Sequence, residues 1–232
     1  MSAKPAELRN LPPSIRIEKR FCGPPDSGNG GYVAGLVASR VPGGAEVTLR
    51  RPPPLEQTLS LREVRCGDAE RVELWDTESA LAVARSAALD LEVPEAPTYA
   101  EAAAASAGAR GRPHVFPTCF VCGPEREEGD GLRILPGPLG RGGRVAAPWI
   151  PHASLADPSG IVAEPFAWAA LDCPGGLAVM GPEPRPVLLG RITARLERPI
   201  HAGRRYVAVG FRLGDEGRKH FAGTALFDAA GR

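Results

Sequence analysis

The sequence predicts an α+β fold made of two copies of one unit, in which a buried helix is followed by several antiparallel strands. Residues 32–40 and 164–176 are almost entirely apolar, and a helix that is apolar on all sides is usually buried. Each segment is followed by short apolar stretches separated by turns rich in glycine and proline. The sequence "LRRP" at 49–52 recurs as "LERP" at 196–199, after the helix of each half, which indicates an internal duplication.

The first half begins with an alternating segment at 14–21, which predicts a strand. A loop of turn-forming residues at 22–31 leads into the first apolar helix. Four further strands are predicted around a proline corner and a turn near Asp76 and Thr77, namely 45–54, 57–66 and two within 70–89.

Residues 94–118 differ in composition from both halves. They are rich in alanine and proline, which predicts a short surface helix inside a linker, with a lid over a site as the alternative. The predicted organisation is therefore an N-terminal unit at 1–93, the linker at 94–118 and a C-terminal unit at 119–232.

The second half repeats the order of elements. Strands are predicted at 131–139 and 143–151, and they precede the apolar helix at 164–176, which a Pro-Gly-Gly sequence is expected to end. Several strands follow, with turns at 201–203 and 214–217.

Composition and charge argue against several classes of protein. The chain of 232 residues has 28 Lys and Arg against 27 Asp and Glu, so it lacks the basic balance typical of nucleic-acid-binding proteins. No segment approaches the roughly 20 apolar residues of a membrane span, and the first residues lack the apolar core of a secretory signal. Five cysteines without a disulfide-type spacing predict reduced thiols and a cytoplasmic location.

Three motifs in this order resemble the thioesterase-like double hot-dog family: "CFVCGPEREEGDGLRI" at 119–134, "AEPFAWAALDCPGG" at 163–176 and "RPIHAGRRYVAVG" at 198–210. The resemblance implies two tandem hot-dog units, each a curved antiparallel sheet wrapped around one central helix, with ligands at the seam between them. It also implies one more strand after the segment at 220–232; either the sequence is truncated there, or that strand is absent and the last edge of the second sheet is open.

The resemblance also implies where the site lies. In the family, a His-Gly-Gly sequence begins the central helix and an acidic residue follows seven positions later. The first half has Asn-Gly-Gly at 29–31 but Ala38 at the acidic position, whereas the second half has Asp172 as the acid but Ala-Glu-Pro at 163–165. We therefore expect one composite site, in which the glycine loop of the first half faces Asp172 across the seam.

The predicted catalytic residues are Asn29, Gly30, Gly31 and Asp172. Glycine lets a backbone approach a ligand closely, and the N–H groups at a helix N-terminus suit a developing oxyanion. The Asn29 amide can hold the thioester oxygen or orient a water, while the Asp172 carboxylate attacks the thioester or activates a water. The alternatives are structural: a simple turn at 29–31, and a last helical residue that faces solvent or a turn amide at Asp172.

The predicted substrate-binding residues are neighbours of these positions, namely Tyr32, Glu164, Phe166 and Trp168. Glu164 also suits the first turn of a helix, where the helix dipole favours an acidic residue.

Cys119 and Cys122 form one CxxC pair, whereas a structural zinc site usually has four ligands. The alternatives are a zinc site, for which His114 lies near in sequence, and a tight turn with buried small side chains. Cys173 is a candidate nucleophile without a histidine beside it in sequence. We expect neither a metal nor another cofactor.

The resemblance implies an acyl-CoA thioesterase-like hydrolase, with acyl-CoA or another acyl thioester as its partner. One alternative is a non-catalytic acyl-CoA or acyl-chain binding protein, which the departure from His-Gly-Gly in both halves favours. Another is a hot-dog hydratase or dehydratase, whose Asp and His would be Asp157 and His152 in reversed order. The fused pair already supplies a hot-dog dimer, and a homodimer of this pair is a further expectation.

Overall fold

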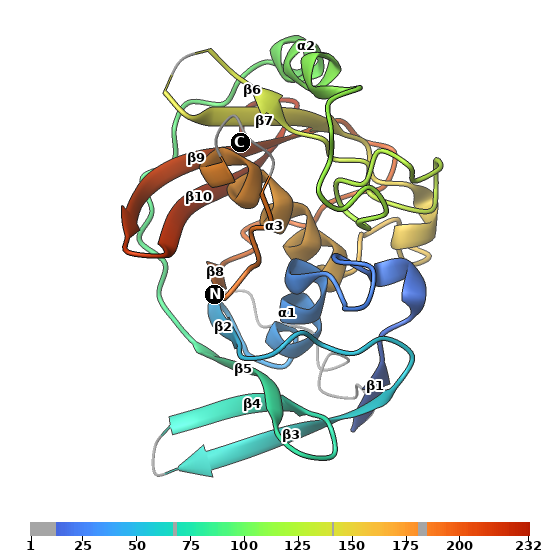
Figure 1. The fold of residues 1–232 in the computed structure, drawn as a ribbon, viewed down its shortest axis with the longest axis vertical. Coiled ribbons are helices and arrows are strands. Elements are labelled where there is room, and N and C mark those ends of the chain that lie inside the picture. Colours follow the sequence, from blue (N-terminus) through green and yellow to red (C-terminus); the bar gives the residue numbers. More distant parts are fainter. Residues whose placement is uncertain (1–12, 67–68, 141, 181–184) are drawn as a thin grey trace.

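The computed structural model describes residues 13–66, 69–140, 142–180 and 185–232, which form two curved antiparallel sheets around a pair of helices (Figure 1). The first sheet has the strand order β1-β3-β4-β5-β2-β8 and the second β10-β9-β7-β6. The strands of the first sheet are β1 (Ser14–Arg16), β2 (Ala45–Leu49), β3 (Thr58–Cys66), β4 (Ala69–Trp75), β5 (Ala80–Ser86) and β8 (Arg191–Ala194). Those of the second are β6 (Gly137–Pro138), β7 (Arg144–Trp149), β9 (Tyr206–Glu216) and β10 (Lys219–Asp228).

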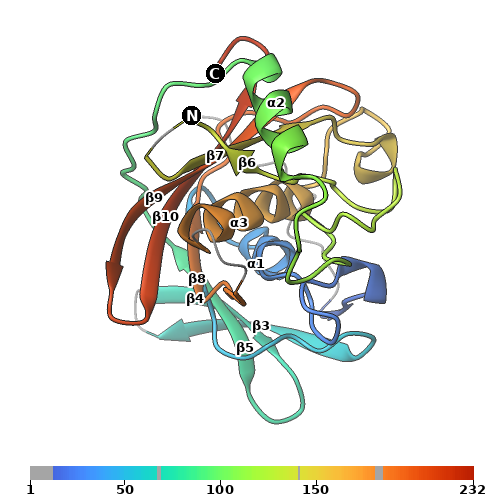
Figure 2. The ribbon, with the colours of Figure 1, turned by 45° about the horizontal axis from the view of Figure 1, so that its top comes forward.

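Two helices, α1 (Gly30–Ala38) and α3 (Glu164–Met180), pack against each other between the sheets (Figure 2). α1 carries no charged residue, and seven of its nine residues are buried. Side chains of both helices and of both sheets form one hydrophobic core, so the α+β class expected from the sequence is confirmed. In the part of the chain that the structure describes, no helix is long and apolar enough to cross a bilayer.

Two glycines of α1 let the helices approach closely. A Cβ atom on Gly31 would lie 2.6 Å from Asp172 Cβ and 2.7 Å from the Trp168 carbonyl oxygen. One turn later, a Cβ atom on Gly35 would lie 2.6 Å from Pro165 Cα. Because such contacts have no room for a side chain, the glycines set how close Asp172 comes to the start of α1.

β8 follows α3 in the chain but pairs with the first sheet, antiparallel to β2. In that sheet, β5 lies between β4 and β2. Among the described residues, no strand takes the corresponding place between β10 and β8, so the outer edge of β10 is open.

Three predicted strands are clearly shorter than the sequence pattern indicates. The segment at 45–54 is a strand only up to Leu49. The segment at 14–21 is a strand only up to Arg16 and continues as a 3-10 turn at Lys19–Phe21. The segment at 131–139 contains only β6, because Arg133 has a φ of 56°, outside the strand region. Alternation alone does not reveal a single residue that leaves the strand conformation.

α3 does not end at the Pro-Gly-Gly sequence of 174–176, as the sequence predicts, but continues to Met180. Proline lacks an N–H group, and in a helix interior it costs about 3 kcal/mol. Gly210 of β9 lies directly against this turn, where a Cβ atom would be 2.0 Å from the Pro174 carbonyl oxygen. Packing on the sheet, which also buries Ala178 and Val179, overrides the local signal.

The alanine-rich linker segment forms α2 (Tyr99–Ala109), which packs on the second sheet instead of standing free at the surface (Figure 1). Ala102 is fully buried against Val207 and Val209, whereas the alternate residue Ala208 belongs to the core around α3. α2 therefore covers the outer face of this sheet. Contacts cross the proposed domain boundaries at 93 and 118, so the fold alone does not divide the chain there. Both boundaries stay predictions.

We expect Gly35→Ala to destabilise the fold by about 1–3 kcal/mol, because the added methyl group has to push α1 away from the backbone of α3. The matched control is Gly176→Ala in α3, where a Cβ atom would meet nothing within 4 Å. That variant should gain up to about 1 kcal/mol from helix propensity alone. Urea unfolding of both variants checks the pair, and a stabilised Gly35→Ala protein would contradict the close crossing.

Candidate active site

Asn29 ends the loop before α1 and caps the helix. Its Oδ1 accepts a hydrogen bond from the Tyr32 N–H at 2.9 Å, as a typical N-cap side chain does. Its Nδ2 donates to Oδ2 of Asp172 at 3.2 Å. Asn29 is only 2% exposed, so its amide is fixed between the helix that it caps and a carboxylate from the other half of the chain.

Asp172 lies in the middle of α3 and binds the start of α1. Its Oδ2 also accepts the Gly31 backbone N–H at 2.8 Å, so both hydrogen bonds end on one oxygen. A carboxylate at a helix N-terminus is stabilised by the free N–H groups and the helix dipole. The structure thus brings together Asn29, Gly31 and Asp172, and Asp172 is not a last helical residue.

The environment of Asp172 raises its pKa to about 6 from an ordinary 3.8. Burial is the largest cause, and the nearby Cys119 acts in the same direction. The hydrogen bonds from Gly31 and Asn29 oppose this rise, because they stabilise the ionised form. A carboxyl with a pKa of about 6 is a stronger base than an ordinary Asp and is still ionised at neutral pH.

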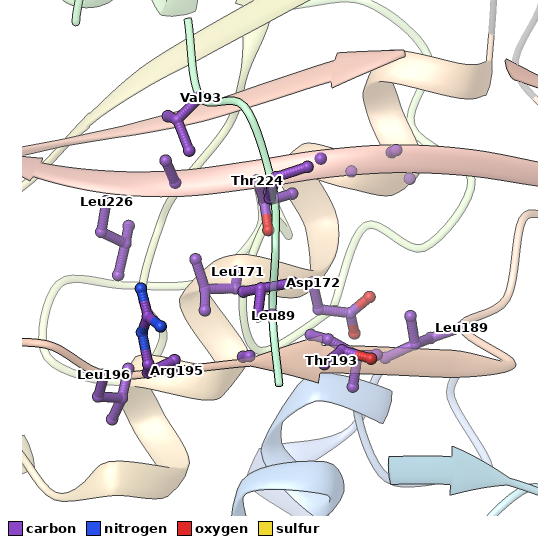
Figure 3. Close-up of a pocket in the computed structure, with 18 of the residues that line it drawn as sticks. Leu89, Val93, Leu171, Asp172, Leu189, Thr193, Arg195, Leu196, Thr224 and Leu226 are labelled. Atoms are coloured by element: carbon purple, nitrogen blue, oxygen red, sulfur yellow. The ribbon is translucent and has the colours of Figure 1, made fainter. Parts of the chain in front are cut away.

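A groove of about 2010 Å³ opens beside Asp172, between β8 and β10, whose facing edges pair with no strand among the described residues (Figure 3). Its apolar lining includes Leu171 and Val179 of α3, Leu189 and Leu196 on either side of β8, and Leu226 of β10. Figure 3 shows Asp172 and Leu189 toward one end and Arg195 and Leu196 toward the other. Among the described lining residues, nine are Lys or Arg and five are Asp or Glu, so the groove is basic.

Gly30, the first residue of α1, is covered from the groove side. A Cβ atom on Gly30 would lie 2.9 Å from Leu189 Cβ and 3.1 Å from Leu49 Cδ1. Leu189 belongs to an irregular segment before β8 and also lines the groove. Access to the Gly30 backbone therefore depends on the position of this side chain.

The four residues expected to bind substrate do not line this groove. Tyr32 and Phe166 stack at 5.7 Å in an aromatic cluster with Phe21 and Phe120, and burial raises the pKa of Tyr32 to about 12. Trp168 is 1% exposed, and Glu164 begins α3. Substrate contact by these residues stays a prediction, and for Trp168 it would require the core to open.

Three thiols lie beside the carboxylate. The sulfur atoms of Cys119, Cys122 and Cys173 are all within 4.8 Å of one another, and Nδ2 of Asn29 lies 3.9 Å from the Cys119 sulfur. Bonds from the thiols of Cys122 and Cys173 hold the pKa of Cys119 well below its usual range. The pKa of Cys173 is raised by the same contacts and by burial, which makes it a poor nucleophile.

The sequence alone could not place Cys173 in this group, since it lies 54 positions from Cys119. The basic lining of the groove was also missed, because its arginines are scattered over 185–232 without a helical or strand period.

His152 and Asp157, the pair considered for a hydratase, are engaged in local turns. Nδ1 of His152 contacts the Ser154 hydroxyl at 2.9 Å, and Asp157 accepts backbone bonds from Ser159 and Ile161. The pair supports its own loop and does not converge with the groove residues.

Solved structures with a similar fold are found at low sequence identity. A hot-dog protein from Alicyclobacillus acidocaldarius matches with a TM-score of 0.58 and 10% identity, over 94% of this chain and 87% of that one. The chain has a hot-dog fold. An acyl-CoA thioesterase II from Mycobacterium marinum (TM-score 0.57, 12% identity, 94% and 87% coverage) and a dehydratase domain from Pseudomonas fluorescens (0.51, 16%, 94% and 88%) share it. No family model and no curated protein matches the sequence.

We expect the titration of Asp172 to lower folding stability as the pH rises from about 4 to about 6. The folded chain holds this proton more tightly than the unfolded chain does, so raising the pH through this window favours unfolding. Asp172→Asn keeps an acceptor for the Gly31 N–H but does not titrate. Relative to the wild type it should gain up to about 3 kcal/mol at about pH 8 and little at about pH 4. Urea unfolding at both pH values measures this, and an equal effect at both would contradict the raised pKa.

Proposed function

We propose that the protein is an acyl-thioester hydrolase whose site is the seam where Asp172 of α3 meets the start of α1. The observation that carries this proposal is the pair of bonds from Gly31 and Asn29 to one oxygen of Asp172, at the wall of a large groove. A helix N-terminus and a carboxylate are the two groups that thioester hydrolysis needs, one for the oxyanion and one for water. The thioesterase among the proteins of the same fold supports the same reaction class.

In the proposed reaction, a water bound by Asp172 attacks the thioester carbonyl carbon and gives its proton to the carboxylate. Oδ1 takes this proton, because Oδ2 accepts the two bonds that orient the side chain. The negative charge moves to the carbonyl oxygen, which we place at the Gly30 N–H after Leu189 has moved. When the carbon–sulfur bond breaks, the thiolate takes the proton from Asp172, and a carboxylic acid and a thiol leave.

The groove suits an acyl-CoA as the thioester. Its leucines offer an apolar surface to an acyl chain, and its excess of arginines suits the phosphates of coenzyme A. Arg195 stands between Leu196 and Leu226 in the groove, where Figure 3 shows its guanidinium.

We also propose that the two halves are a duplicated hot-dog unit related by a two-fold axis. Aligning 49–52 with 196–199 makes Glu46 equivalent to Thr193. In the sheet, Glu46 lies opposite Thr193, Ala45 opposite Ala194 and Val47 opposite Ile192. This register supports a two-fold axis through the Glu46–Thr193 pair. Ala45 faces Ala194, the counterpart of Val47, and Val47 faces Ile192, the counterpart of Ala45.

A non-catalytic acyl-thioester binding protein is the second candidate. It is favoured by the bond between the Gly31 N–H and Asp172, because this donor is then already in use when a carbonyl oxygen arrives. The cytoplasmic location and the homodimer of the fused pair remain predictions.

Asp172→Asn should lower thioester hydrolysis by at least about 100-fold, because the amide cannot take a proton from water. Thiol release from short, long and aromatic acyl-CoAs measures the rate. The matched control is Asp90→Asn, an exposed carboxylate that lines the same groove, which should change the rate less than about twofold. Saturable acyl-CoA binding without turnover in the wild type would select the binding protein instead.

Arg195→Ala should raise the KM for acyl-CoA about fivefold, which corresponds to about 1 kcal/mol for one exposed ionic contact. The KM for an acyl N-acetylcysteamine thioester, which has no phosphates, should not change. Arg65→Ala on β3, outside the groove, is the control. Equal effects on both thioesters would show that Arg195 does not contact the phosphates.

A further inference from the structure

Three buried or half-buried thiols converge from two distant segments of the chain. Sγ of Cys119 lies 3.8 Å from Sγ of Cys173, and the Cys122 sulfur is within 4.8 Å of both. Zinc–thiolate bonds are about 2.3 Å long, so two sulfurs on one tetrahedral zinc lie about 3.8 Å apart. We propose that Cys119, Cys122 and Cys173 form a zinc site.

The backbone already holds the CxxC pair in the form of a tight turn. The Gly123 N–H donates to the Cys119 carbonyl oxygen at 2.9 Å, and a Cβ atom on Gly123 would lie 2.5 Å from that oxygen. The Phe120 N–H donates to the Cys22 carbonyl oxygen, and the Ile134 N–H donates to the Val121 carbonyl oxygen. These two bonds connect the turn to the neighbouring segments. The sulfur atoms, all within 4.8 Å of one another, would have to approach by about 1 Å or less to reach the spacing of zinc ligands.

The alternative, a turn that merely buries small side chains, explains the CxxC pair but not the third thiol. Cys22 shows what a cysteine in a purely packing role looks like here: it is buried, contacts the Thr118 carbonyl and Arg126, and lies outside the group. Cys173, by contrast, is brought to the pair by a different element, α3.

Three protein ligands leave one position of the tetrahedron for water or another small ligand. No fourth His, Cys, Asp or Glu joins the group within the described ranges, and His114, the ligand considered from the sequence, is not in it. An open fourth position is typical of zinc sites with three protein ligands.

The ion would tie the 119–122 turn to α3 at the residue next to Asp172. Asn29 contacts both parts, with its Nδ2 at 3.2 Å from Asp172 and 3.9 Å from the Cys119 sulfur. The proposed zinc site therefore lies next to the proposed catalytic carboxylate. Its test does not depend on thioester hydrolysis, because metal binding is measured directly.

The experiment measures zinc by mass spectrometry in the full chain, purified with a non-chelating reductant. We expect about one zinc per chain in the wild type. Cys119→Ser, Cys122→Ser and Cys173→Ser should each lose most of it, while Cys22→Ser should keep it. Replacement of zinc by Co²⁺ in the wild type should give thiolate charge-transfer bands and the visible bands of tetrahedral cobalt, which do not depend on any variant folding.

A folded, reduced wild type with less than about one zinc per ten chains and no cobalt–thiolate bands would overturn the proposal. So would a disulfide between Cys119 and Cys173 that persists in the presence of the reductant, or a loss of zinc in Cys22→Ser equal to that in the other variants. Zinc binding without hydrolysis would confirm this site and remove only the proposed activity; hydrolysis without zinc would do the reverse.

Discussion

The site depends on the contact between the backbones of α1 and α3. Gly31 and Gly35 remove the side chains that would keep the helices apart, so the carboxyl of Asp172 reaches an N–H group of the opposite helix. Any residue larger than glycine at Gly31 would collide with Asp172 itself. The position of the Asp172 carboxyl group therefore depends on α1 having no side chain at Gly31 and Gly35.

The pKa of Asp172 is the result of two opposing effects. Burial disfavours its charge, while the start of α1 and the Asn29 amide favour it, and burial prevails. The result is a carboxylate that is fixed in direction yet binds protons more readily than an exposed Asp does. A site that lowers folding stability in this way is consistent with function, because packing alone would favour an uncharged residue there.

The proximity of Asn29, Gly31 and Asp172 could be expected from the sequence only through the resemblance to double hot-dog proteins, because Gly31 and Asp172 lie 141 positions apart and no local pattern connects them. The sequence did not separate Tyr32 and Trp168 from the core, since aromatic residues on a buried helix look alike whether they face a ligand or other side chains. The end of α3 was also missed, because the close packing of the turn at Pro174 on Gly210 is a contact between distant segments. For the same reason, Cys173 could be joined to the CxxC pair only in three dimensions.

The placement of β8 has a consequence for how the chain can be divided. This strand belongs to the second half, yet its hydrogen bonds complete the sheet of the first, while the turn at 119–122 bonds back to Cys22. A fragment that ends in the linker would lose an edge strand and the helix that covers α1, which exposes apolar surface on both pieces. In our proposal the two halves descend from one duplicated unit, but they are not independent units of folding. Combining one half with a foreign partner would therefore require a new interface along the whole seam.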